Sequence, residues 1–186
     1  MADPATRDAT YEDLLQVEDH LVAELIHGQL VTTPRPAPRH ARASSLLGVE
    51  LGGPYDKGHG GPGGWWILDE PEVHLGSHVL VPELAGWRRE RMPGLPETAW
   101  FELAPDWVCE VLSESTARVD RVEKLPVYAA HGVGHVWLVD PVLRTLEAYA
   151  NHEGHWLLLN AFENDDPVAI APFDAVTIPL GGLWAD

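Results

Sequence analysis

The sequence predicts an α/β fold in which a mixed sheet is flanked by helices. Segments with the two-residue alternation of strands are interspersed with segments that suit helices, and further short strands follow towards the C-terminus. The chain has 186 residues, of which 45% are hydrophobic and 22% charged, and this suits one globular domain over residues 1–186. We therefore expect a single domain with a mixed central sheet and extra antiparallel strands at its C-terminus.

The N-terminal part contains the first predicted elements. Thr10 and Asp13 form a capping pattern before a partial apolar face, which predicts a short helix. The segment AELIHGQLVTT alternates around Gly28 and predicts a strand or a tight hairpin. Prolines then precede ARASSLLGVEL, for which we expect a helix of about three turns that ends at Gly52 and Gly53.

The middle of the chain combines loops and strands. The glycine-dense segment YDKGHGGPGG predicts an exposed loop. WWILDEPEVHL and SHVLVPELAGW predict two strands joined around Gly76, with Pro82 at a strand end or an edge because proline has no amide donor. A proline-rich connection leads to WVCEVL, an apolar strand over residues 107–112.

A helix and further strands complete the prediction. Asp120 and Glu123 suggest a box-like cap for the helix, and Pro126 is expected to kink it or delay its regular start. Gly132 and Gly134 end the helix. The remaining strands are HVWLVDP, TLEAYAN, HWLLLNAF and AVTIPL, of which the middle two are joined by the turn NHEG.

The sequence lacks the features of membrane and secreted proteins. No run approaches the roughly 20 apolar residues of a membrane span. The segment MADPATRDATYEDLL has neither the basic nor the apolar region of a secretory signal. The single cysteine, Cys109, lies in an apolar segment, where we expect it to pack in the core. We expect a cytoplasmic protein with no membrane contact.

The formal net charge of −17 opposes general binding of nucleic acids at long range. Nine of the twelve basic residues nevertheless fall in three short clusters. They are Arg35, Arg39 and Arg42, then Arg88, Arg89 and Arg91, then Arg118, Arg121 and Lys124. The clusters either converge into a local positive patch or form three separate solvated faces, and both interpretations are open at this stage.

One acid stands inside the apolar strand WVCEVL. Burial of an unpaired carboxylate is costly, so Glu110 needs a proton, a cation or a hydrogen-bond partner. A divalent metal would supply the cation, and so would a buried lysine or arginine. Glu83 follows Pro82 at a strand end, and Lys124 lies on the helix after Glu110. Two acids and a lysine suit Mg²⁺ or Mn²⁺ and the hydrolysis of a phosphodiester.

Four ordered segments carry a resemblance to a known family. AELIHGQLV, PRPAPRHAR, VLVPEL and WVCEVLSESTARVDRVEKLPVYAAHGVGHVWLVDP resemble, in order and spacing, the putative restriction endonuclease family within the PD-(D/E)XK nuclease superfamily. The resemblance covers about residues 10–150 and implies a restriction-endonuclease-like core. It also implies Mg²⁺-dependent hydrolysis of DNA and, commonly, a homodimer.

The resemblance also implies roles for individual residues. Glu83 and Glu110 match the two acids that bind the metal, and Lys124 matches a catalytic lysine that this family carries on the next helix. Glu24 matches an acid that completes the metal shell, and His40 matches the histidine after the proline-rich segment. From their clusters, we take three basic residues as candidate phosphate contacts, namely Arg35, Arg39 and Arg121.

Three positions depart from the family pattern. Glu83 replaces an aspartate and lengthens that side chain by one methylene, Glu114 replaces a proline, and Pro126 interrupts the helix of Lys124. A second interpretation therefore stays open, in which the protein is a catalytically degenerate nuclease fold that serves as a non-catalytic interaction or oligomerisation module.

Overall fold

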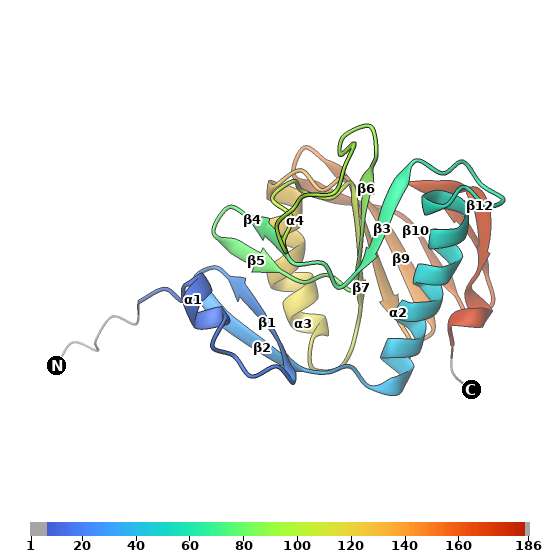
Figure 1. Ribbon diagram of the computed structural model, residues 1–186. Helices are drawn as coiled ribbons and strands as arrows, with labels where there is room; N and C mark the ends of the chain where they lie inside the picture. The colour runs from blue at the N-terminus through green and yellow to red at the C-terminus, as the bar shows by residue number, and fades with distance from the viewer. Residues whose placement is uncertain (1–6, 185–186) are drawn as a thin grey trace.

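A six-stranded sheet runs through the computed structural model, which describes residues 7–184 (Figure 1). β7 and β8 are parallel at its centre, and every other neighbouring pair in it is antiparallel. The predicted mixed sheet is therefore confirmed. In order across the sheet, the strands are β10 (His155–Glu163), β9 (Thr145–His152), β8 (His135–Asp140), β7 (Trp107–Val111), β6 (Leu84–Arg88) and β3 (Trp65–Asp69).

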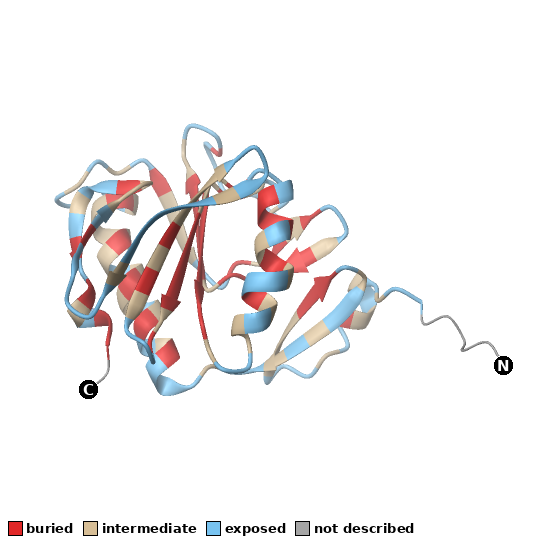
Figure 2. Cartoon of the chain, turned by 180° about the vertical axis from the view of Figure 1, so that it is seen from behind, coloured by how far each residue is buried: buried red, intermediate tan, exposed pale blue. Residues whose placement is uncertain are grey.

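Helices cover both faces of this sheet, as Figure 1 shows. Trp107 and Cys109 of β7 are buried in one cluster with residues of α2 (Pro38–Leu51), whereas Val108 is buried in another with residues of α4 (Leu125–Ala130). Successive side chains of a strand point to opposite faces, so the alternation expected for β7 is confirmed. Buried positions follow the central strands in Figure 2.

A second sheet of four strands carries the N-terminal hairpin. The hairpin turns at His27 and Gly28, whose φ angles are 51° and 73°, and this left-handed backbone suits a two-residue hairpin turn. Gly76, with a φ of 63°, makes the turn of the other hairpin. In order across the sheet, the strands are β2 (Gln29–Pro34), β1 (Leu21–Ile26), β5 (His78–Leu80) and β4 (Val73–Leu75).

The two continuous strands predicted around Gly76 are wrong, because each one is divided. Glu70 adopts a φ of 44° and Pro71 follows it without an amide donor, so the first segment separates into β3 and β4. The second segment separates around Pro82 into β5 and β6. In each case the two halves join different sheets, and Glu83 consequently lies at the junction between the sheets.

The helical run after β7 begins earlier than predicted. Asp120 lies inside it and is not its cap. Instead, the amides of Ser113 and Thr116 each donate to the other's hydroxyl oxygen at 3.2 Å just before the first turn. One short α-helical turn precedes a π turn, and the longer α-helix starts only at Leu125, next to Pro126, as the expected delay requires. The run consists of α3 (Ala117–Val119), the π turn η2 (Asp120–Lys124) and α4.

The predicted N-terminal helix is present, and the predicted glycine-rich loop is present except at its start. α1 (Tyr11–Leu14) carries the reciprocal cap between Thr10 and Asp13 that the sequence predicts. The predicted loop begins inside a π turn, η1 (Gly52–Asp56), which directly continues α2. Tyr55 is buried there, so this part of the segment contributes to the core and is not exposed.

The C-terminal strands form a separate hairpin that completes the α2 side of the molecule (Figure 1). Phe173 and Ile178 are buried in the same cluster as Trp107. The predicted antiparallel strands are therefore present, although β9 and β10 belong to the main sheet. No helix within residues 7–184 is long and apolar enough to cross a membrane. The hairpin and final turn are β11 (Pro167–Ile170), β12 (Phe173–Pro179) and the 3₁₀ turn η3 (Leu180–Leu183).

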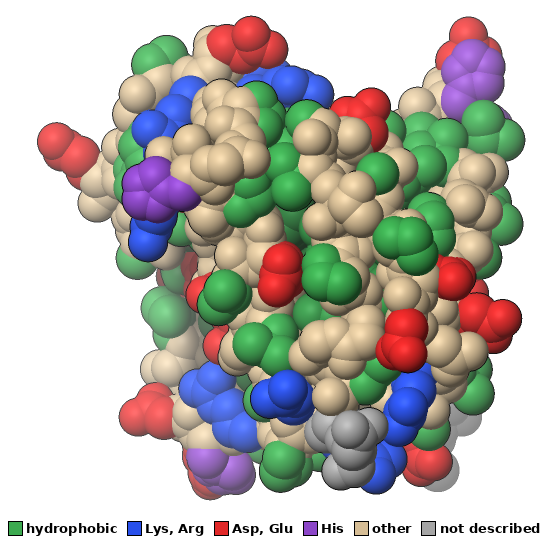
Figure 3. Space-filling view, turned by 90° about the vertical axis from the view of Figure 1, so that its right-hand side faces the viewer, with side chains coloured by type: hydrophobic (Ala, Val, Ile, Leu, Met, Phe, Trp, Pro, Cys, Tyr) green, Lys and Arg blue, Asp and Glu red, His purple; other side chains and the backbone are tan. Residues whose placement is uncertain are grey.

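The face that carries α2 and β12 shows no continuous charged surface. In Figure 3, hydrophobic and uncharged side chains cover most of this face, and the basic side chains form small groups with acidic side chains nearby. This distribution suits an acidic protein in which several of the basic residues pair with nearby acids.

Three histidines meet where the two hairpins of the second sheet approach the end of α4. The ring of His78 lies 4.9 Å from that of His27 and 5.8 Å from that of His131, between centroids. The backbone amide of His27 donates to Nδ1 of His78 at 3.2 Å. Burial and the two neighbouring rings lower the pKa of His78 below its ordinary value. A protonated ring would lose the acceptor at Nδ1, so the fold favours neutral His78.

We predict that His78 makes the protein less stable at acidic pH. The unfolded chain binds a proton on this residue near pH 6.5, whereas the folded chain binds it only at lower pH, so stability falls as the pH drops through about 6.5. His78→Gln should lose less stability than wild type between pH 7.5 and 5.5, measured by urea unfolding. His155→Gln, at an exposed position, is the control. Equal pH dependence for wild type and His78→Gln would contradict this.

Candidate active site

Segments from both sheets and two helical elements meet at a cavity of about 220 Å³. β1 provides Glu24, the junction between β5 and β6 provides Glu83, and β7 provides Glu110. Helical segments complete the wall with His40 on α2, and with Asp120 and Lys124 at the two ends of η2. The cavity therefore collects acids and a lysine from distant parts of the chain.

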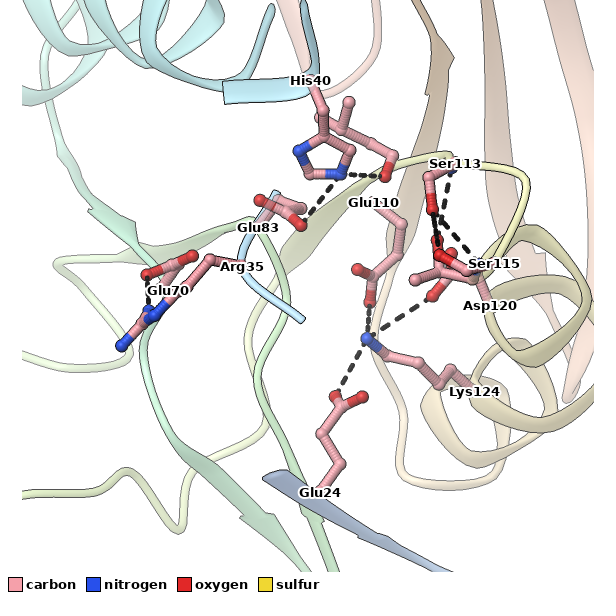
Figure 4. Close-up of polar contacts among 12 residues, drawn as sticks. Glu24, Arg35, His40, Glu70, Glu83, Glu110, Ser113, Ser115, Asp120 and Lys124 are labelled. Atoms are coloured by element: carbon pink, nitrogen blue, oxygen red, sulfur yellow. Dashed lines mark hydrogen bonds and ion pairs between the residues drawn. The ribbon is translucent and has the colours of Figure 1, made fainter. Parts of the chain in front are cut away.

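Lys124 occupies the centre of the acidic part of this cavity. Its Nζ lies 2.8 Å from Oε1 of Glu110, 3.0 Å from Oε1 of Glu24 and 3.6 Å from Oδ1 of Asp120 (Figure 4). The residue is only 3% exposed. Burial opposes its charge, but attraction by Glu110 and Glu24 is stronger and raises the pKa of Lys124 well above its ordinary value. Lys124 is therefore a buried cation.

Glu110 has two partners at a single oxygen. Oε1 accepts a hydrogen bond from the hydroxyl of Tyr128 at 2.6 Å and lies against the ammonium of Lys124. The residue is 2% exposed. Burial raises the pKa of Glu110 to about 8 although Lys124 acts in the opposite direction, and the charge of Asp120 adds to the rise. The charge of Lys124 alone consequently does not offset the burial and the mutual repulsion of the acids around it.

Glu24 and Asp120 hold Lys124 from two further sides. The amide of Val81 donates to Oε1 of Glu24 at 2.8 Å, and this is the oxygen that faces the lysine. Figure 4 shows Glu24 on the opposite side of the lysine Nζ from Glu110. Burial raises the pKa of Asp120 above its ordinary value, while Lys124 opposes this rise. Both acids thus act directly on the lysine.

Glu83 points towards His40 and away from Lys124 (Figure 4). Nε2 of His40 lies 3.1 Å from Oε1 of Glu83 and 2.5 Å from the carbonyl oxygen of Val111. A ring nitrogen between two acceptors must carry a proton. Burial opposes the charged ring, but Glu83, the carbonyl of Val111 and Asp120 together outweigh it and raise the pKa of His40. The structure thus places Glu83 and His40 in the cavity with the lysine cluster, although neither contacts Lys124.

The predicted phosphate contacts are dispersed. Arg35 lines the cavity, with Nη1 3.6 Å from Oε2 of Glu70, whereas Arg39 is exposed on α2 and makes no ion pair within residues 7–184. Arg121 lies 3.8 Å from Glu147 and outside the cavity lining. The three sequence clusters therefore do not converge into one positive patch.

The cluster around Arg89 is remote from the site. It lies at the end of β6 opposite to Glu83, where the Arg88 guanidinium lies over the Trp65 ring and the other two arginines pair with acids. Arg89 contacts Asp56 at 2.8 Å and Arg91 contacts Asp106 at 2.7 Å.

Sequence reasoning missed two members of the site. It assigned Asp120 to a helix cap and Tyr128 to the core, whereas both contact the charged cluster. Their spacing contained a signal, because Asp120 and Tyr128 lie four residues before and four residues after Lys124. Residues four apart lie on one face of a helix, so both side chains were placed to reach the lysine or its partner.

The donor atoms of the cavity suit a hard divalent cation. Its carboxylates and the carbonyl of Val111 offer only oxygen, which Mg²⁺ and Mn²⁺ prefer, and the cavity lining contains no thiol. Among the described residues, however, no three acidic, histidine or cysteine side chains already form a metal site. Lys124 holds the central position among three of the acids instead. The chemistry of the residues fits a metal next to this cluster, at Glu83 and Glu110.

Comparisons with known proteins agree with this architecture. A family profile described as Uma2, putative restriction endonuclease, matches residues 8–181. A crystal structure described as a putative nuclease belonging to DUF820, from Anabaena variabilis, is 22% identical with a TM-score of 0.75, and the match covers 95% of this chain and 97% of that one. That likeness shows the fold. No curated protein is similar enough to match. Because the profile spans nearly the whole chain, the chain belongs to the Uma2 family of putative restriction endonucleases.

Proposed function

We propose that the protein is a Mg²⁺-dependent or Mn²⁺-dependent endonuclease that hydrolyses DNA phosphodiester bonds. The observation that carries the proposal is the excess of buried negative charge in the cavity. Glu24, Glu83, Glu110 and Asp120 share it with two cationic side chains, Lys124 and His40, so the carboxylates outnumber the cations. Buried charges are retained where they are paired or bind metal, and a divalent ion would balance the excess. Family membership supports the same chemistry.

Glu83 and Glu110 would hold the metal, and Glu24 would complete its surroundings. When bound, the metal would acidify a water molecule and stabilise charge on the phosphoryl oxygens. Lys124 would orient the attacking water or neutralise the charge that develops. The attacking water would lose a proton to solvent as its oxygen bonds to phosphorus, one P–O ester bond would break, and the leaving oxygen would take a proton from solvent. The carboxylates that surround Lys124 keep it protonated for this task.

Arg35, Arg39, Arg121 and His40 are the proposed contacts to the DNA. Arg35 and His40 line the cavity, so they would act next to the reacting phosphate. Arg39 and Arg121 lie outside it, where they would contact neighbouring phosphates. A DNA substrate is consistent with the cytoplasmic location that the sequence predicts.

We further propose that two copies pair through the edge strand β10. Leu157, Leu158 and Leu159 are 58%, 51% and 36% exposed, and the segment 156–162 carries no charge in a chain of net charge −17. β10 has one neighbour in the sheet, so its outer edge offers free backbone donors and acceptors. Antiparallel pairing of two such edges is self-complementary and gives a symmetric homodimer.

A second candidate function is a non-catalytic oligomerisation module. The pairing of basic residues with acids favours it, because Arg35 and Arg121 already face Glu70 and Glu147. An acidic surface whose arginines are engaged in this way suits self-association through β10 better than DNA binding. Catalysis and DNA binding discriminate between the two functions.

We predict that cleavage of supercoiled DNA in Mg²⁺ or Mn²⁺ falls by about 100-fold or more in Glu110→Gln and in Lys124→Met, because each loses charge stabilisation at the reacting phosphate. Product formation on gels measures this. Glu97→Gln and Lys57→Met, both exposed, are the matched controls and should cleave like wild type. If wild-type protein cleaves no supercoiled, linear or single-stranded DNA with either metal, the oligomerisation module is the better account.

We predict that a double variant, Arg39→Gln with Arg121→Gln, binds DNA more weakly than wild type. Fluorescence anisotropy with Ca²⁺ in place of Mg²⁺ measures the affinity. The slope of log affinity against log salt should decrease by about 1 for each phosphate that the variant no longer neutralises. Arg7→Gln, whose arginine pairs with Asp13 near α1, is the control. An unchanged slope would exclude these arginines as phosphate ligands.

We predict that wild-type protein sediments as a dimer and that Leu158→Glu shifts it to a monomer, because charges at the centre of the paired edges repel. Val49→Glu places the same charge at a 67% exposed position on α2 and should remain dimeric. Sedimentation velocity distinguishes the two species. Monomeric wild-type protein at micromolar concentration would contradict pairing through β10.

A further inference from the structure

The two carboxylate oxygens of Glu110 have different surroundings. Oε1 receives the Tyr128 hydroxyl at 2.6 Å and lies 2.8 Å from Nζ of Lys124. Both of these contacts are made by Oε1, and Glu110 also lines the cavity. One oxygen of this carboxylate is therefore bound to the protein, and the other is available.

We propose that Tyr128 is a positioning residue for metal binding. Its hydroxyl, together with the ammonium of Lys124, holds Oε1 of Glu110 and so leaves Oε2 as the oxygen that receives the divalent ion. This inference rests on the proposed function, because it assigns a partner to a carboxylate that the proposal makes a metal ligand.

Tyr128 is rigid enough for this task. Its side chain is fully buried and packs in the cluster between α4 and the main sheet. A tyrosine has only two side-chain torsions before its hydroxyl, and here packing fixes both. Burial and the neighbouring Glu110 charge raise the pKa of Tyr128 well above its ordinary value, so the hydroxyl keeps its proton and remains a donor.

Glu110 needs such a partner because its own side chain has three torsions, and the last of them exchanges the two oxygens. Lys124 alone does not prevent the exchange, since it divides its contacts among three acids. A donor that approaches from the core side fixes the carboxylate plane. Partners of this kind orient metal ligands, and their removal typically weakens metal affinity by about 10-fold to 100-fold.

Tyr149 provides a matched control. Its hydroxyl donates to Oε2 of Glu147 at 2.8 Å on β9, so Tyr149→Phe removes a tyrosine-to-glutamate hydrogen bond that lies outside the cavity lining. Tyr128→Phe and Tyr149→Phe therefore delete the same group from the same kind of contact, and only the first contact involves a proposed metal ligand.

Mn²⁺ binding to the metal-free protein tests the inference without DNA or activity. Free Mn²⁺, followed by its electron paramagnetic resonance signal, is titrated with wild type, Tyr128→Phe, Tyr149→Phe, Glu110→Gln and the double variant Tyr128→Phe with Glu110→Gln. Circular dichroism establishes that each variant is folded. We expect Tyr128→Phe to bind Mn²⁺ about 10-fold more weakly than wild type and Tyr149→Phe to bind like wild type. We also expect Tyr128→Phe to cause no further weakening in the Glu110→Gln background.

The outcomes separate this inference from the proposed function. Wild-type binding with equal affinity in Tyr128→Phe overturns the positioning role and leaves the metal site intact. An equal weakening by Tyr128→Phe with and without Glu110→Gln also overturns it, because Tyr128 would not act through Glu110. Absence of Mn²⁺ binding by wild type overturns the proposed metal dependence and the inference with it.

If Tyr128→Phe does not fold, Glu110→Asp serves as the second variant. Glu83→Asp shortens the other proposed ligand, which has no contact with Tyr128, and is its control. Glu110→Asp, which moves the carboxylate away from the hydroxyl, should weaken Mn²⁺ binding more than Glu83→Asp does, and equal losses overturn the inference.

Discussion

The burial of Lys124 among carboxylates is the constraint on which the rest of the site depends. A buried ammonium without partners would be strongly destabilising, so Glu24, Glu110 and Asp120 must reach one point from β1, β7 and η2. The two sheets consequently have to approach each other at the ends of these strands. The division of the strands around Pro82 serves the same geometry, because it lets one segment contribute to both sheets.

The four acids of the cavity outnumber its two cationic side chains, Lys124 and His40, and this imbalance distinguishes the site from a structural ion pair. A pair that exists only for stability would match its charges and its hydrogen bonds. Here burial keeps a carboxyl at Glu110 with a pKa of about 8, and His40 carries a proton between Glu83 and the carbonyl of Val111. The protons on Glu110 and His40 and the ammonium of Lys124 therefore take positions that suit cations. A divalent ion could replace such protons and bind to the same carboxylates.

The sequence predicted the local part of this arrangement well. Strand periodicity located Glu110 on a buried strand, and the order of segments placed the helix of Lys124 directly after it. In the structure, Nζ of Lys124 lies 2.8 Å from Oε1 of Glu110. Asp120 and Tyr128 were assigned to other tasks, because a polar residue near a helix start and an aromatic residue on an apolar face each have a commoner explanation. The sequence did not predict the division into β5 and β6, because the alternation of apolar residues continues across Pro82. Only the hydrogen-bond partners change there, from strands of one sheet to strands of the other. Pairing between arginines and acids was equally inaccessible, since it depends on neighbours that are distant in sequence.

The distribution of the site along the chain has a consequence for folding. Glu24 and Lys124 are separated by 100 positions, and they meet only when the N-terminal hairpin, which pairs with β5, approaches η2. Contacts between such distant positions close long loops and slow the search for the native state. The charged cavity is consequently absent from any partly folded chain that lacks this docking, including the nascent chain before α4 has left the ribosome. A chain of this kind cannot assemble its reactive centre before Lys124 has been synthesised, so under the proposed function shorter nascent chains would not cleave the DNA around them.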